Sequence, residues 1–101
     1  MGAGRAQAGR RPGIVFQASE LPGVRLSAVL VVPLTTQQAA LRFPGTVLIS
    51  PEIGNGLRQQ SVALVFQMAA VDLDFVGTPV GKVSTTAVSQ LMQALDELFG
   101  N

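Results

Sequence analysis

The chain has 101 residues, of which 48% are hydrophobic and 13% are charged, and its net charge is +1. This length and balance indicate one folded domain rather than a disordered segment. The sequence contains no cysteine, histidine, tryptophan or tyrosine, which excludes disulfides, thiolate metal sites, histidine-based nucleases and serine–histidine hydrolases. The longest uninterrupted apolar run, residues 28–34, is too short to span a membrane.

The first half of the chain predicts short strands separated by turns. Residues 1–9 include six small residues and show no hydrophobic periodicity, and we expect them to form a flexible lead-in. Apolar, β-branched runs predict strands, and polar or Pro/Gly-rich segments predict the turns between them. The predicted strands are 13–17, 25–34 and 43–49, and the predicted turns are 19–23, 35–42 and 50–56. Pro33 should weaken or bulge its strand because proline cannot donate to a ladder.

The second half predicts further strands and then one helix. Residues 60–67 predict a strand, 68–74 are ambiguous and have room for one helical turn, and 78–83 predict a short edge strand. The helix prediction depends on apolar residues at spacings of three and four, which make one stripe. These residues are Val88, Leu91, Met92, Leu95 and Phe99, with Ser84 as the N-cap and Gly100 as the stop.

This order of elements predicts the fold class. Several short strands followed by a single C-terminal helix are too few for a sandwich of usual size. We therefore expect a mainly β protein, a small and strongly bent antiparallel barrel with the helix packed on it.

Positive charge is concentrated at the N-terminus. Arg5, Arg10 and Arg11 lie within the first eleven residues and leave four basic and six acidic residues for the rest of the chain. Such a segment on a near-neutral body suits an anion such as phosphate. The alternative interpretation is a solvated tail with no binding role.

The residues that could carry chemistry are few. Asp72 and Asp74 could hold Mg²⁺, but Glu52, Asp96 and Glu97 lie elsewhere in the sequence, and we expect no metal centre. The Gly-Asn-Gly sequence at 54–56 indicates a turn rather than a phosphate loop. Arginine and hydroxyl groups remain, and these suit metal-free RNA cleavage, in which the 2′-OH attacks its own phosphate. An arginine fork and a threonine hydroxyl could stabilise the resulting phosphorane.

Five segments of the chain occur in an order that points to a known family. They are QAGRRPGIVFQ (7–17), VVPLTTQ (31–37), FPGTVLIS (43–50), SVALVFQMAAVD (61–72) and GKVS (81–84). With the closing helix they resemble the MazF/PemK/Kid family of toxin endoribonucleases over residues 7–100. The resemblance implies an SH3-like barrel, a homodimer, an antitoxin partner, and cleavage of single-stranded RNA without metal or cofactor in the cytoplasm.

The resemblance also implies which residues form the site. The catalytic arginine would be Arg11, directly before the proline, and the catalytic threonine would be Thr35, the first hydroxyl residue of Pro-Leu-Thr-Thr. Gln67 would lie near the RNA, and we expect Arg10 and Thr36 to contact it as well.

The chain departs from the family pattern in ways that keep other functions open. The family begins with a further strand, so we expect that strand to be missing here and the barrel domain to span 10–101. Ala6 and Ala69 stand where an acidic and a basic residue are usual. One alternative is therefore a weak or inactive relative that dimerises and binds its antitoxin. Another is a poison of DNA gyrase like the CcdB relatives of this fold.

Overall fold

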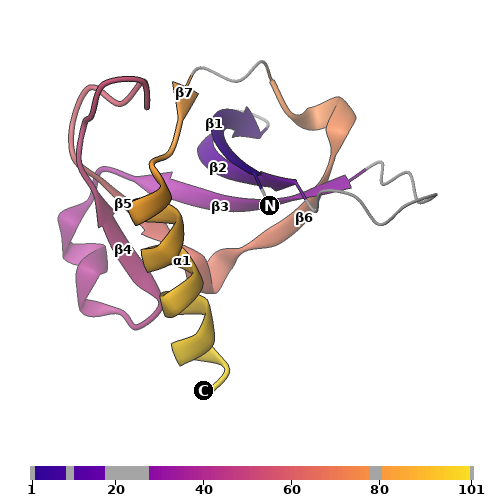
Figure 1. The fold of residues 1–101 in the computed structure, drawn as a ribbon. Coiled ribbons are helices and arrows are strands. Elements are labelled where there is room, and N and C mark those ends of the chain that lie inside the picture. The colour runs from indigo at the N-terminus through magenta and orange to yellow at the C-terminus, as the bar shows by residue number, and fades with distance from the viewer. Residues whose placement is uncertain (1, 9–10, 18–27, 78–80, 101) are drawn as a thin grey trace.

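The computed structural model of the chain describes residues 2–8, 11–17, 28–77 and 81–100 (Figure 1). The strands are β1 (Gly2–Ala8), β2 (Arg11–Gln17), β3 (Ala28–Thr35), β4 (Thr46–Ile49), β5 (Ser61–Leu64), β6 (Ala69–Asp72) and β7 (Gly81–Lys82). The helices are α1 (Thr85–Leu98) and the 3₁₀ turns η1 (Gln38–Arg42), η2 (Val65–Gln67) and η3 (Leu73–Phe75).

The described strands form one antiparallel sheet in the order β4-β5-β3-β2-β1-β7. Strand β3 lies at the centre of the sheet. On one side it pairs with β2, and on the other side its first half pairs with β6 and its end with β5. On this second side β3 changes partner at Val32 and Pro33, because β6 pairs with β3 as far as Val31 and β5 pairs with it from Leu34 onward. A proline, which has no N–H to donate, is tolerated in the middle of β3 where the ladder changes partner.

Helix α1 covers one face of the sheet and closes the main core. It packs on β4 and η2 (Figure 1), and Leu91, which is 2% exposed, reaches the strands. The core that it covers combines apolar residues of four strands with η2 and the helix. These are Ile14, Phe16, Val32, Leu34, Val47, Ile49, Ala63, Val65, Leu91 and Ala94. A smaller cluster of Val15, Val29 and Val31 with Val71 and Val76 lies on the opposite face.

Both predicted ends of the helix are confirmed. The Ser84 side chain accepts a hydrogen bond from the N–H of Ala87 at 3.1 Å, which satisfies one of the free donors of the first turn. Gly100 follows the helix at φ +77°, a left-handed conformation that glycine adopts without strain. The predicted fold class, a mainly β protein with one C-terminal helix, is likewise confirmed, although β4 and β7 stay unpaired with each other and the sheet is open.

The expected absence of a strand before the arginine pair is wrong. Gly2–Ala8 form β1, which pairs with β2 from Gly2↔Gln17 to Ala8↔Arg11 and with β7 at Arg5↔Gly81. Glycine and alanine have low strand propensity, so the strand depends on backbone partners supplied by β2 and β7 on its two sides. Residues 1, 9 and 10 lie outside the described part, and the domain boundary that we placed between 9 and 10 stays a prediction.

The other differences are local. The strand expected over 60–67 ends at Leu64, where η2 begins, and the ambiguous segment becomes β6 followed by η3. The predicted loop after Thr35 contains η1. Within the described residues, no helix has the length and apolar character that crossing a membrane requires.

Candidate functional site

An open hollow of about 220 Å³ lies where the start of β2, the end of β3 and the β4–β5 loop come together. Its lining residues are Pro12, Leu34, Thr36, Gly56, Leu57, Arg58, Gln59 and Ser61. Pro12 directly follows Arg11, and Thr36 directly follows Thr35. The hollow therefore brings together the two chain segments that the sequence predicted for the site.

The register of β2 and β3 indicates how the chain segments of Arg11 and Thr35 lie relative to each other. The two strands pair at Gly13↔Pro33 and Ile14↔Val32. Continued one step beyond Gly13↔Pro33, the same register would set Pro12 opposite Leu34, and both of these residues line the hollow. A second step of this extrapolation would set the backbone of Arg11, the first residue of β2, opposite that of Thr35, because partners in an antiparallel ladder advance in opposite directions.

Thr35 is held by a turn at the end of β3. Its Oγ1 accepts a hydrogen bond from the N–H of Gln37 at 3.1 Å, the local bond by which a hydroxyl residue stabilises a turn. A hydroxyl that accepts one bond can still donate its own proton. The Thr35 side chain is half-buried, and Thr36 beside it is exposed at the rim of the hollow.

The β4–β5 loop owes its shape to a buried amide. Asn55 is 3% exposed, and its Oδ1 accepts hydrogen bonds from the backbone N–H groups of Glu52 at 3.2 Å and Leu57 at 3.0 Å. Its Nδ2 donates to the carbonyl oxygen of Ser50 at 2.9 Å. The amide ties both arms of the loop together and so fixes the segment that lines the hollow.

Strand β7 supports the same loop from outside. The N–H of Lys82 donates to the carbonyl oxygen of Gly54 at 2.8 Å. A Cβ atom on Gly81 would lie 2.6 Å from that same oxygen, so only glycine permits this close approach.

Arg58 is the site residue that sequence reasoning missed. It is an exposed cation on the hollow, and none of the described lining residues is acidic. The sequence does show Arg58, a basic residue, between a turn-rich segment and a predicted strand. Nothing in the sequence, however, indicated that Asn55 would fold the loop back toward β2 and β3.

The remaining predicted site residues lie elsewhere. Gln67 is exposed at the end of η2, beyond the end of β5 that is distant from the hollow. Arg10 lies outside the described residues, and for Arg11 the structure describes the backbone position alone.

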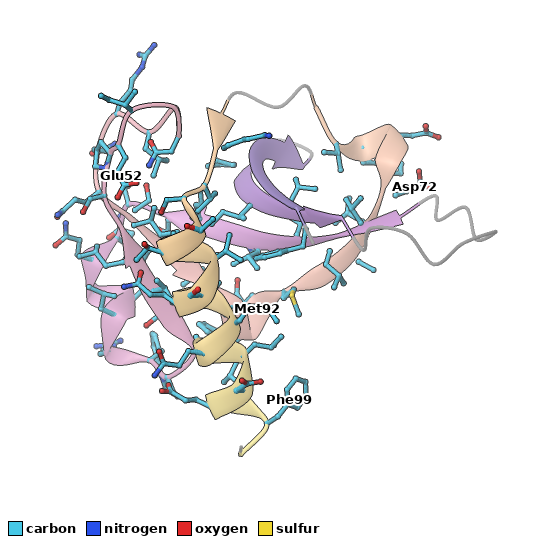
Figure 2. The ribbon with its side chains drawn as sticks, in the orientation of Figure 1. Glu52, Asp72, Met92 and Phe99 are labelled. Carbon is cyan, nitrogen blue, oxygen red and sulfur yellow. The ribbon has the colours of Figure 1, made fainter. Side chains whose placement is uncertain are left out.

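The acidic residues do not gather into a metal site in the described part of the chain. No group of three potential ligands is found there, and Figure 2 places Glu52 and Asp72 at opposite sides of the molecule. The Asp72 carboxylate instead accepts a hydrogen bond from the N–H of Asp74 at 2.9 Å. This local turn at the start of η3 accounts for the spacing of the two aspartates.

The fold is that of a MazF toxin structure. A matching solved structure is the Mycobacterium tuberculosis toxin MazF-mt6, with a TM-score of 0.70 at 21% sequence identity over 99% of this chain and 97% of that one. A family model described as PemK-like, MazF-like toxin of type II toxin–antitoxin systems matches residues 2–99. The chain belongs to this toxin family, and the predicted resemblance is confirmed. No curated protein matches the chain.

Proposed function

We propose that this toxin is a metal-independent endoribonuclease that cuts single-stranded RNA at the hollow between β2, β3 and the β4–β5 loop. Membership of the toxin family supports the assignment. The observation that supports it is that Pro12 and Thr36, which directly follow Arg11 and Thr35 in the sequence, line one hollow.

The proposed reaction needs charge stabilisation above all. The 2′-oxygen of the RNA attacks the adjacent phosphorus, the bond to the 5′-oxygen breaks, and the products are a 2′,3′-cyclic phosphate and a 5′-hydroxyl. The phosphorane between these states carries extra negative charge on its non-bridging oxygens. The guanidinium of Arg11 donates hydrogen bonds to those oxygens, and the Thr35 hydroxyl supplies a further donor.

In this mechanism water, rather than a protein side chain, transfers the protons. The chain contains no histidine, and an arginine stays protonated throughout the accessible pH range. Water therefore receives the proton of the 2′-hydroxyl and supplies one to the departing 5′-oxygen. The contribution of the protein is electrostatic, and loss of one such donor costs about 100- to 1000-fold in rate.

Other residues hold the RNA on either side of the cleaved bond. Arg58 and Thr36 line the same hollow and bind a flanking phosphate. Arg10 and Gln67 contact the strand further away, since Gln67 lies beyond the other end of β5.

The partners of this toxin are a second copy of the chain and an antitoxin. Figure 2 shows Met92 and Phe99 on the same side of α1, and they are 36% and 73% exposed. Apolar side chains gathered on one face favour burial against another molecule, and a symmetric homodimer buries the same face of both copies. The antitoxin occupies the RNA groove in the cytoplasm, where the two proteins meet their substrate.

Cleavage of a long single-stranded RNA in EDTA tests the proposal. The wild type should cut the RNA and leave cyclic phosphate ends, and Arg11→Ala should abolish cutting with an unchanged circular-dichroism spectrum. Lys82→Ala, which removes an exposed cation from β7, is the matched control and should cut normally. Absence of cleavage by the wild type would refute the ribonuclease and leave an inactive relative that binds its antitoxin. Growth arrest with broken DNA and intact RNA would point to gyrase.

A further inference from the structure

Two phenylalanines form an exposed aromatic pair at the far end of η1 from the hollow. The ring centroids of Phe43 and Phe66 lie 6.1 Å apart at an interplanar angle of 51°. Their side chains are 45% and 43% exposed. The Cζ atom of Arg42 lies over the ring of Phe43, 5.0 Å from its centroid, within the range of a cation–π interaction. We refer to these three residues as the aromatic site.

Hydrogen bonds to backbone carbonyl groups hold the aromatic site in place. The N–H of Phe66 donates to the carbonyl oxygen of Gly45 at 3.2 Å. The hydroxyl of Thr46 donates to the carbonyl oxygen of Phe43 at 2.9 Å. Both rings therefore extend from fixed backbone, Phe43 directly after η1 and Phe66 within η2. Little conformational entropy is lost when a ligand binds, because the rings are already ordered.

The aromatic site is connected to the hollow by η1. This turn starts just after Thr36 and ends at Arg42, and its five residues span about 10 Å at a rise of about 2.0 Å per residue. Near the hollow, the Gln38 side chain donates to that of Gln60 at 3.0 Å. Since stacked bases repeat at about 3.4 Å along one strand, the aromatic site lies a few nucleotides from the hollow.

We propose that the aromatic site binds a base of the single-stranded RNA a few nucleotides from the cleaved phosphate; this inference rests on the proposed function. Phe66 offers a ring face to the base, Phe43 braces that ring from the side, and Arg42 neutralises a neighbouring phosphate. Aromatic rings and arginine planes are the surfaces on which proteins stack unpaired bases.

The polar neighbours of the pair favour RNA over a protein partner. Arg42 supplies positive charge at the ring, and the exposed amide of Gln67 directly follows Phe66. An amide can donate to and accept from a base edge. The apolar core of a protein interface is instead depleted in charged residues.

Because the chain contains no tryptophan or tyrosine, the fluorescence of a single introduced tryptophan can report on stacking without background. Phe66→Trp introduces the only indole of the chain, and its fluorescence reports directly on a base stacked against it. The ligand is a single-stranded 2′-O-methyl oligoribonucleotide, which cannot be cut because its attacking hydroxyl is blocked. We expect saturable quenching of Phe66→Trp. Phe75→Trp, at a phenylalanine of η3 that is 67% exposed, is the matched control and should not be quenched.

Affinity measurements separate stacking from plain hydrophobic contact. Phe66→Leu and Phe43→Leu keep much of the apolar area but lose the ring face, and each should weaken oligonucleotide binding about 5- to 100-fold. Arg42→Ala should weaken binding and reduce its salt dependence. Circular dichroism of each variant checks that the fold is kept.

The outcomes distinguish this inference from the proposed ribonuclease. Arg11→Ala should lose cleavage and keep the quenching of Phe66→Trp. If the chain binds the oligonucleotide without cutting RNA, the ribonuclease fails and the aromatic site stands. Normal cleavage combined with no quenching and no loss of affinity in the leucine variants would overturn the aromatic site alone. An indole signal that changes with protein concentration, in the absence of RNA, would also overturn it, because a second copy would then cover the rings.

Discussion

Replacement of Asn55 by alanine removes the side chain that shapes the β4–β5 loop. Hydrogen bonds join the amide to backbone groups of Ser50, Glu52 and Leu57. The Asn55 side chain is buried, so in the alanine variant water has little access to the backbone groups that the amide had bonded. The variant leaves two N–H groups and one carbonyl oxygen without the partners that organised the loop.

The expected loss of stability follows from those bonds. Each intramolecular hydrogen bond contributes roughly 1 kcal/mol net, so loss of the three bonds should lower the free energy of unfolding by about 3 kcal/mol. For a domain of this size, 1 kcal/mol corresponds to about 4–8 °C in Tm. The melting temperature should therefore fall by about 12–24 °C. RNA cleavage should fall as well, because Leu57 and Arg58 lose their fixed position on the hollow.

Urea denaturation followed by circular dichroism measures this effect, at one fixed protein concentration because the proposed dimerisation would add to stability. The matched control is Ile53→Ala in the same loop, where the side chain is 107% exposed and the change should stay within about 0.5 kcal/mol. If Asn55→Ala loses no more stability than this control, the buried amide does not organise the loop and our explanation of the hollow is wrong.

Three further predictions concern α1. Leu91→Ala should lower the free energy of unfolding by about 2–5 kcal/mol, measured by urea denaturation, because Leu91 is 2% exposed in the main core. Ser84→Ala should cost about 1 kcal/mol through loss of the N-cap, whereas Ser89→Ala on the exposed face of the same helix should not destabilise. Met92→Glu combined with Phe99→Glu should turn the proposed dimer into a monomer in sedimentation at micromolar concentration. An unchanged dimer would exclude this face as the interface.

The helix and the central strands could be predicted because their signals are local. The stripe from Val88 to Phe99 repeats at the helical period, and Ser84 and Gly100 mark its ends. The central strand β3 is an apolar run buried on both faces, which the sequence displays directly. Elements whose own residues carry the pattern are therefore predictable without knowledge of their neighbours.

Strand β1 could not be predicted because its stability comes from its partners. Its glycines and alanines show no strand pattern, and it forms along the free edges of β2 and β7. The same reason explains η2, where an apolar run continues in the sequence but the backbone turns between β5 and β6. Tertiary pairing overrides local propensity in both places.

The residues of the proposed site came only partly from the sequence. Arg11 and Thr35 came from the resemblance to the toxin family, and no composition or spacing argument distinguished them from solvated residues. Arg58 was missed because its position depends on the amide of Asn55, three residues earlier. The aromatic site was missed because Phe43 and Phe66 are 23 positions apart in the sequence and meet only through two 3₁₀ turns.

A double-mutant cycle on EDTA-resistant RNA cleavage tests the central claim most directly. The rates of wild type, Arg11→Ala, Thr35→Val and the double variant are compared on one RNA. If both side chains stabilise the same phosphorane, the double variant should lose less than the product of the two single losses, with a coupling of at least about 0.5 kcal/mol. Independent losses, or single variants that cut as fast as the wild type, would contradict a site shared by residues 11 and 35.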